Sequence, residues 1–226
     1  YYQATVTPTV VFNGKPKTGG GYVVHAQHFY NDYMKDVEPA LKETSEIELQ
    51  ISAEGDADNM YLSAEAIRLG GFEDHLRLRM AIVENGIPYE AENGMFYHEK
   101  VVRIMPGGAE GIAPVDGKLT YKAEIPLAEY RKQLNDGLDA YEYAYSNATG
   151  KDFHFPMRPI GPQSLQFIAF VQDDNTKQVL QSAMVSLQPT AAALEAVRAQ
   201  EAEAAKKDAN PKKAGEPAAK SPEEAK

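Results

Sequence analysis

Histidines are the residues of this chain whose type and spacing come closest to a chemical site. His25 and His28 lie three residues apart in a segment with helical periodicity, so both could face one metal ion. Asp32 lies one turn further on, but no third ligand with matching spacing follows. The helix face that carries them is otherwise polar, which favours solvent-exposed histidines over a metal site. The sequence therefore predicts no bound metal and no other cofactor.

Recognisable catalytic arrangements are absent from the sequence. The 226 residues include no cysteine, which excludes disulfides, thiolate metal sites and cysteine nucleophiles. His98 stands beside Glu99, but adjacent residues of a strand point to opposite faces, so a structural, hydrogen-bonded His98 is the better interpretation. No Gly-x-Ser-x-Gly or His-Glu-x-x-His motif occurs. We therefore predict no catalytic residue in this chain and expect it not to be an enzyme.

Aromatic residues offer a binding surface instead. Tyr89, Tyr97 and Tyr141 are the candidates for an exposed aromatic platform that could stack on a sugar. Tyr141 and Tyr145 are four residues apart, so they would share one face of a helix. Packing in the core, or as a lid over the fold, is the commoner role of such residues because aromatic side chains bury large areas.

Charge and hydropathy exclude further classes of function. The formal net charge is −10, from 23 basic and 33 acidic residues, whereas a nucleic-acid-binding face needs clustered lysine and arginine. No apolar run of about 18 residues occurs, so the sequence contains no candidate for a transmembrane helix. The first residues lack a basic segment followed by an apolar one, so we expect no signal peptide within this chain.

Hydrophobic periodicity predicts a mainly β fold. From Glu46 onward, about seven segments alternate apolar with polar residues, and Gly, Asp and Asn turn signals separate them. This pattern favours an antiparallel, immunoglobulin-like β-sandwich over residues 46–189. One inserted helix is predicted within it, near 127–145, because apolar residues recur at helical spacing after Pro126.

Two segments flank the predicted sandwich. Residues 1–45 are typical of strand, turn, strand and helix, with Asn13 and Gly14 as a hairpin signal. Residues 190–226 are rich in Ala, Lys, Glu and Pro and contain no aromatic residue. We expect a short helix there, followed by a disordered tail, since this composition cannot bury a core.

The front segment resembles part of a known fold. Val6-Thr7-Pro8-Thr9-Val10-Val11-Phe12-Asn13-Gly14 is similar to the cis-proline region of the thioredoxin family. In that family a Thr-Pro-Thr run precedes a strand, a turn, a second strand and a final helix. The resemblance implies that residues 1–45 are a partial thioredoxin-like unit, in which a cis bond at Pro8 turns Thr7 towards a substrate peptide. The family's Cys-x-x-Cys would lie upstream, so a fragment of a thiol–disulfide oxidoreductase is one alternative.

Later segments resemble outer-membrane-protein-related (Omp-type) bacterial envelope proteins, which often have a redoxin-like front. The similarity lies in residues 78–89, 98–103 and 167–181. It implies an exported protein, periplasmic or extracellular, that is associated with the envelope. We therefore predict a non-catalytic binding or accessory module with an unidentified protein or peptide partner. A carbohydrate-binding β-sandwich is the other alternative.

Overall fold

The structure is a computed structural model that describes residues 1–2, 9–18, 25–56, 58–90, 94–156, 158, 161, 164–195 and 198–199. The chain divides into two units, Tyr1–Pro189 and Thr190–Lys226. In the second unit, residues 191–195 are helical, and Thr190 Oγ1 accepts a hydrogen bond from the Ala193 N–H at 3.1 Å. The tail that the sequence predicts to be disordered lies outside the described residues. The division between residues 1–45 and 46–189 stays a prediction.

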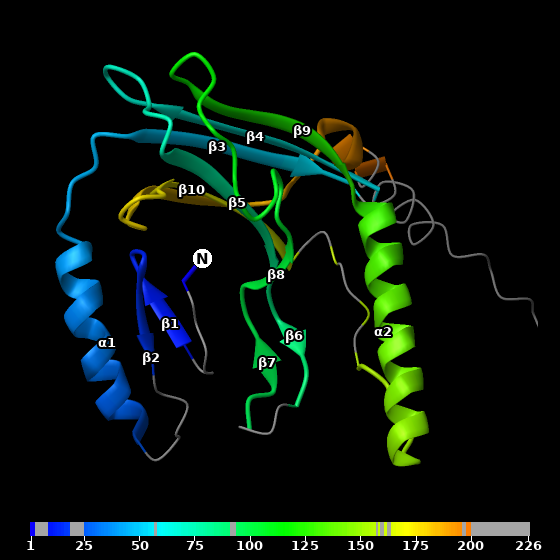
Figure 1. The fold of residues 1–226 in the computed structure, drawn as a ribbon. Coiled ribbons are helices and arrows are strands. Elements are labelled where there is room, and N and C mark those ends of the chain that lie inside the picture. Colours follow the sequence, from blue (N-terminus) through cyan, green and yellow to red (C-terminus); the bar gives the residue numbers. More distant parts are fainter. Residues whose placement is uncertain are drawn as a thin grey trace, which may run out of the picture. The chain divides into compact units, whose positions relative to one another are not determined.

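The first unit contains a β-sandwich of two four-stranded sheets (Figure 1). One sheet has the strand order β11-β10-β5-β8 and the other has β12-β3-β4-β9. Within them, β12 runs parallel to β3, and the remaining neighbours are antiparallel. The strands are β3 (Glu48–Gly55), β4 (Asn59–Ile67), β5 (Leu76–Glu84), β8 (Val101–Ile104), β9 (Leu119–Pro126), β10 (Leu165–Asp173), β11 (Val179–Ser186) and β12 (Gln188–Pro189). The prediction of a mainly β, antiparallel sandwich is confirmed.

Alternation of side chains along the strands builds the core between the two sheets. The register places Leu78 of β5 opposite Val171 of β10. Leu62 of β4 and Leu119 of β9, in the other sheet, are buried in the same hydrophobic cluster. The apolar side chains of β5 and β10 with no exposed surface are Leu78, Met80, Ile82, Phe167, Ala169 and Val171. Every second residue of these strands therefore points inward, as the sequence pattern predicts.

A hairpin and a helix precede the sandwich. β1 (Thr9–Phe12) pairs with β2 (Lys15–Thr18) through Asn13 and Gly14, both of which have positive φ. Gly14 lies against the turn after β10, since a Cβ there would be 1.8 Å from the Lys177 carbonyl oxygen. α1 (Ala26–Ala40) follows, and its Tyr33 ring lies 5.1 Å from the Phe12 ring. The order of elements agrees with the sequence, while the thioredoxin-like identity stays a prediction.

A longer helix and a short hairpin carry the aromatic candidates. α2 (Leu127–Thr149) begins directly after β9 at Pro126, and it extends beyond the predicted range of 127–145. Gly150, with a φ of 66°, ends the helix by donating its N–H to the Ser146 carbonyl at 2.8 Å. β6 (Ile87–Pro88) and β7 (Tyr97–His98) form an antiparallel pair between β5 and β8 in the sequence.

Candidate functional site

A cavity of about 250 Å³ lies between β6, β7 and β8 on one side and α2 with residues 155–156 on the other. Its walls are mainly aliphatic and aromatic, and its polar lining residues are His98 and Arg103. We call this cavity, with the rings of Tyr89 and Phe155 in its wall, the aromatic cleft. His98 is fixed by its own hairpin, because its Nε2–H donates to the Tyr89 carbonyl at 3.0 Å.

Aromatic rings from three parts of the chain meet at the cleft. The Phe155 ring centroid is 6.0 Å from that of Tyr89 and 5.7 Å from that of Tyr141. On α2, Tyr141 stacks on Tyr145 with their centroids 6.2 Å apart. Phe153 packs edge-on against Phe155 at 5.0 Å. These separations are those at which aromatic rings attract each other. Phe155 therefore joins Tyr89 and Tyr141, two of the residues singled out in the sequence, into one cluster.

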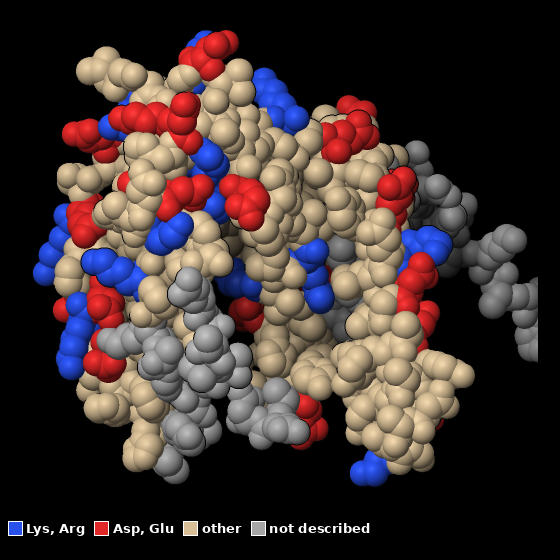
Figure 2. Space-filling model, in the orientation of Figure 1, with Lys and Arg blue, Asp and Glu red and all other residues tan. Residues whose placement is uncertain are grey.

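The cluster is open to solvent. Tyr141 is 52% exposed, and Tyr97, which lies opposite Pro88 in the β6–β7 pair, is 66% exposed. Phe96 and Tyr143 are exposed as well. Figure 2 shows that the C-terminal end of α2 is covered mainly by uncharged side chains, whereas acidic and basic groups alternate over the sandwich. Exposed aromatic groups gathered beside a cavity are typical of an interaction surface.

Glu142 attaches the segment that carries Phe155 to α2. Its side chain is 9% exposed and accepts hydrogen bonds from the Phe155 N–H at 2.9 Å and from His154 Nδ1 at 3.0 Å. Arg158 Nη2 lies 3.0 Å from both carboxylate oxygens. The sequence pointed to no partner for His154, because nothing in local spacing relates it to a carboxylate 12 residues earlier in the chain. Glu142, His154 and Arg158 were therefore missed.

The Glu142–His154 contact shifts the pKa of both groups. The hydrogen bond to Glu142, and next the charge of Asp152, raise the pKa of His154 above its ordinary value of 6.5. The same bond, together with that from the Phe155 N–H, lowers the pKa of Glu142 below its ordinary 4.5. The charged forms of both side chains thus stabilise the attachment of the Phe155 segment to α2.

We expect the Phe155 amide to be best protected from hydrogen exchange between pH 4.5 and 6.5. A raised histidine pKa stabilises the fold below the unfolded value, and this contribution is lost as pH rises through the folded pKa. A lowered carboxyl pKa stabilises the fold above the unfolded value, and this is lost as pH falls through the folded pKa. Protection factors, measured by NMR, should fall on both sides. In His154→Gln the alkaline fall should disappear, and its persistence would refute the assignment.

Arg103, in the wall of the aromatic cleft, belongs to a buried ion pair. Glu84, at the end of β5, has no exposed surface, and its Oε2 accepts a hydrogen bond from Arg103 Nε at 2.8 Å. Its Oε1 accepts bonds from the Gly161 N–H at 2.8 Å and the Ser164 hydroxyl at 3.3 Å. Among the described residues, the two Nη groups of Arg103 have no partner. They present donors and positive charge to the cleft.

His25 and His28 do not line this cleft. Thr7 and Pro8 lie outside the described residues, so their peptide-facing role and the cis bond stay predictions. His25 precedes α1 and His28 lies in its first turn, and both are exposed. In the described part of the chain, no three His, Asp or Glu side chains are grouped so that they could hold a metal ion.

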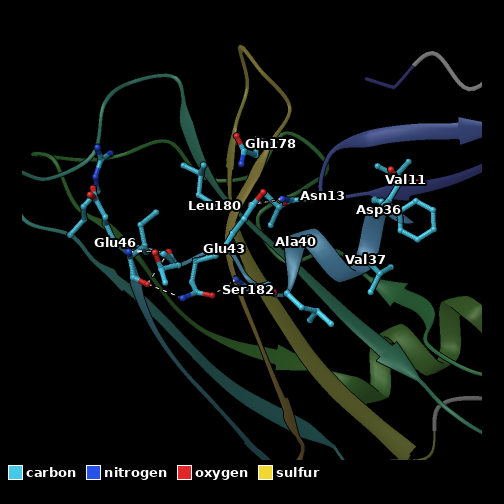
Figure 3. A pocket seen from close by; sticks show the side chains of 18 residues that line it. Val11, Asn13, Asp36, Val37, Ala40, Glu43, Glu46, Gln178, Leu180 and Ser182 are labelled. Carbon is cyan, nitrogen blue, oxygen red and sulfur yellow. Dashed lines mark hydrogen bonds between the residues drawn. The ribbon is translucent and has the colours of Figure 1, made fainter. Parts of the chain in front are cut away.

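A second, larger cavity of about 610 Å³ lies beside the N-terminal half of β11 (Figure 3). Its other walls come from β1, the C-terminal end of α1 and residues 43–47. Its lining mixes aliphatic side chains with carboxylates, in contrast to the aromatic cleft.

Across the described helices, none has the length and apolarity needed to cross a membrane.

The chain has structural similarity to a solved protein domain. No family model matches the chain, and no curated protein matches it. The chain is similar to the crystal structure of a domain of the outer membrane lipoprotein Omp28 from Porphyromonas gingivalis, with 14% sequence identity. The match covers 66% of this chain and 93% of that chain, with a TM-score of 0.41.

Proposed function

We propose that this chain is a non-catalytic binding module of an exported envelope protein, and that the aromatic cleft holds a segment of a protein partner. The observation that carries the proposal is the cleft itself, where exposed tyrosines surround a cavity whose wall offers the free donors of Arg103. Tyrosine and arginine are among the residues that most often dominate binding energy at protein interfaces. The periplasmic or extracellular location is proposed from the resemblance of residues 78–89, 98–103 and 167–181 to envelope proteins.

The size of the cleft favours a docked side chain over a separate small ligand. Its volume of about 250 Å³ lies below the range of roughly 300–1,000 Å³ that is common for small-molecule sites. A cavity of this size suits one or two apolar side chains of a partner, with the exposed rings of Tyr97 and Tyr141 forming the surrounding contact area.

Carbohydrate binding is the second candidate, and one observation favours it. Tyr141 and Tyr145 are stacked one turn apart on α2, and Tyr141 is exposed. A ring with an exposed face can pack against the apolar side of a sugar. Binding of a glycan that is lost in Tyr141→Ala, without any protein partner, would support this candidate over the first.

Site-specific photo-crosslinking of the full chain tests the proposal. A photoreactive phenylalanine analogue at Tyr97 should crosslink to a partner protein in cells, whereas the analogue at Tyr61 should not. Tyr61 is a matched control because it is a tyrosine of the β4 strand with 43% exposure. Tyr141→Ala should weaken the partner's binding by about tenfold or more, as for an interface anchor. Equal crosslinking at both positions, or none at Tyr97, would refute the proposal.

A further inference from the structure

The side-chain amide of Gln181 occupies the open edge of β11. Its Nε2–H donates to the Ile47 carbonyl at 2.9 Å, and its Oε1 accepts from the Ser182 N–H at 2.9 Å. Ile47 directly precedes β3, so the amide connects the two sheets where they diverge. A primary amide has the donor and the acceptor of a peptide group. Gln181 therefore stands where a peptide group of an added strand would pair.

The direction of the Ser182 N–H identifies this edge as unpaired. Directly after β11, the Leu187 N–H points towards β10, because it donates to the Leu165 carbonyl at 3.0 Å. Main-chain groups of successive residues point to opposite sides of a strand, and Ser182 and Leu187 are an odd number of residues apart, so the Ser182 N–H points away from β10. Among the described strands, none pairs with β11 on that side. An unpaired edge of this kind is a template for an additional strand.

The larger cavity gives such a strand room. It follows residues 178–182, and its volume of about 610 Å³ is within the range of ligand sites. Figure 3 shows Leu180 and Ser182 along β11, with Val37 and Ala40 of α1 across the cavity. The single side-chain amide of Gln181 spans the distance from the Ser182 N–H to the Ile47 carbonyl, since it is hydrogen-bonded to both. One extended chain fits this space, with apolar contacts at its far side.

The charge of the cavity wall indicates which side chains an added strand would carry. Glu43 and Glu46 line the cavity, and the last turn of α1 contains no basic residue. The carbonyl end of a helix adds partial negative charge. The basic lining residue Arg68 lies 2.8 Å from Glu73, which compensates its charge. The cavity is therefore complementary to lysine or arginine.

We propose that this cavity binds an extended peptide segment that carries lysine or arginine, and that the main chain of this segment replaces the Gln181 amide between Ser182 and Ile47. The mode is addition of a strand to a sheet edge, in which main-chain hydrogen bonds hold the peptide and alternate side chains enter pockets. The site is separate from the aromatic cleft, and the inference does not depend on the function proposed for that cleft.

Binding of a labelled peptide to the full chain, followed by fluorescence anisotropy, tests this site. The probe is a peptide of alternating valine and lysine. We expect it to bind the natural chain, and to bind Gln181→Ala about three- to tenfold more tightly, because the competing amide is removed. A version of the probe with N-methylated amides should not bind, because it cannot pair with the edge. A valine–glutamate version should not bind either.

Carboxylate variants keep the test decisive if Gln181→Ala is unstable. Glu43→Gln with Glu46→Gln should weaken the probe by about threefold or more, as expected for lost charge pairing. Glu65→Gln is the matched control, because Glu65 is exposed on β4 and does not line the cavity. Equal binding of the N-methylated probe, an equal loss in Glu65→Gln, or no gain in a folded Gln181→Ala would overturn the proposal.

Discussion

Replacing Leu78 with alanine will lower the free energy of unfolding by about 2–5 kcal/mol. Leu78 has no exposed surface and faces Val171 within the sandwich. Its backbone is bonded to Ile112 in both directions, at 3.0 and 2.9 Å, as well as paired with β10. The main chain is therefore held on two sides, so the structure cannot easily close the cavity that the missing atoms leave. Urea unfolding followed by circular dichroism measures the change.

Met184→Ala is the matched control for this experiment. Met184 lies on β11 of the same sheet but is 53% exposed, so its truncation should change the stability by no more than about 0.5 kcal/mol. The two substitutions both remove a flexible aliphatic side chain from a strand. Similar losses at both positions would show that the inner and outer faces of this sheet are assigned wrongly.

The sandwich could be predicted because the strands are marked by local alternation of apolar and polar residues. Residues 76–82 and 165–171 alternate so regularly that one buried face follows from the pleat. The pairing of β5 with β10 could not be predicted in the same way. The two strands are separated by β6 to β9 and α2, so no turn fixes their register. Their partnership results from filling the shared core, which period-two alternation does not encode.

The aromatic cleft could be predicted only in part. The sequence shows which residues are aromatic, but it does not show which residues distant in the chain contact each other. Tyr89 and Tyr141 were candidates as exposed aromatic residues, yet the ring that joins them is Phe155. Phe155 lies in a segment without regular secondary structure, which Glu142 attaches to α2 through the Phe155 N–H. Neither hydrophobic periodicity nor a motif marks such an attachment. Gln181 is similar, since a polar residue of a strand gives no sign that its amide caps an edge.

Replacing Arg103 with methionine will destabilise the fold by about 3–5 kcal/mol. The carboxylate of Glu84 is fully buried, and Arg103 supplies the opposite charge at 2.8 Å. Methionine has a similar shape but no charge, so Glu84 would remain buried with only the neutral donors of Gly161 and Ser164. Removing one partner of a buried pair costs far more than the pair itself contributes. Urea unfolding of the variant measures the loss.

Two further variants separate this charge effect from a general loss of packing. Arg68→Met removes an arginine with the same N–O distance of 2.8 Å, but its partner Glu73 is 55% exposed, so the cost should stay within about 1 kcal/mol. Adding Glu84→Gln to Arg103→Met should recover part of the stability, because the glutamine oxygen can still accept the Gly161 N–H and no buried charge remains. A double variant less stable than Arg103→Met alone would mean that packing, and not the unpaired carboxylate, causes the loss.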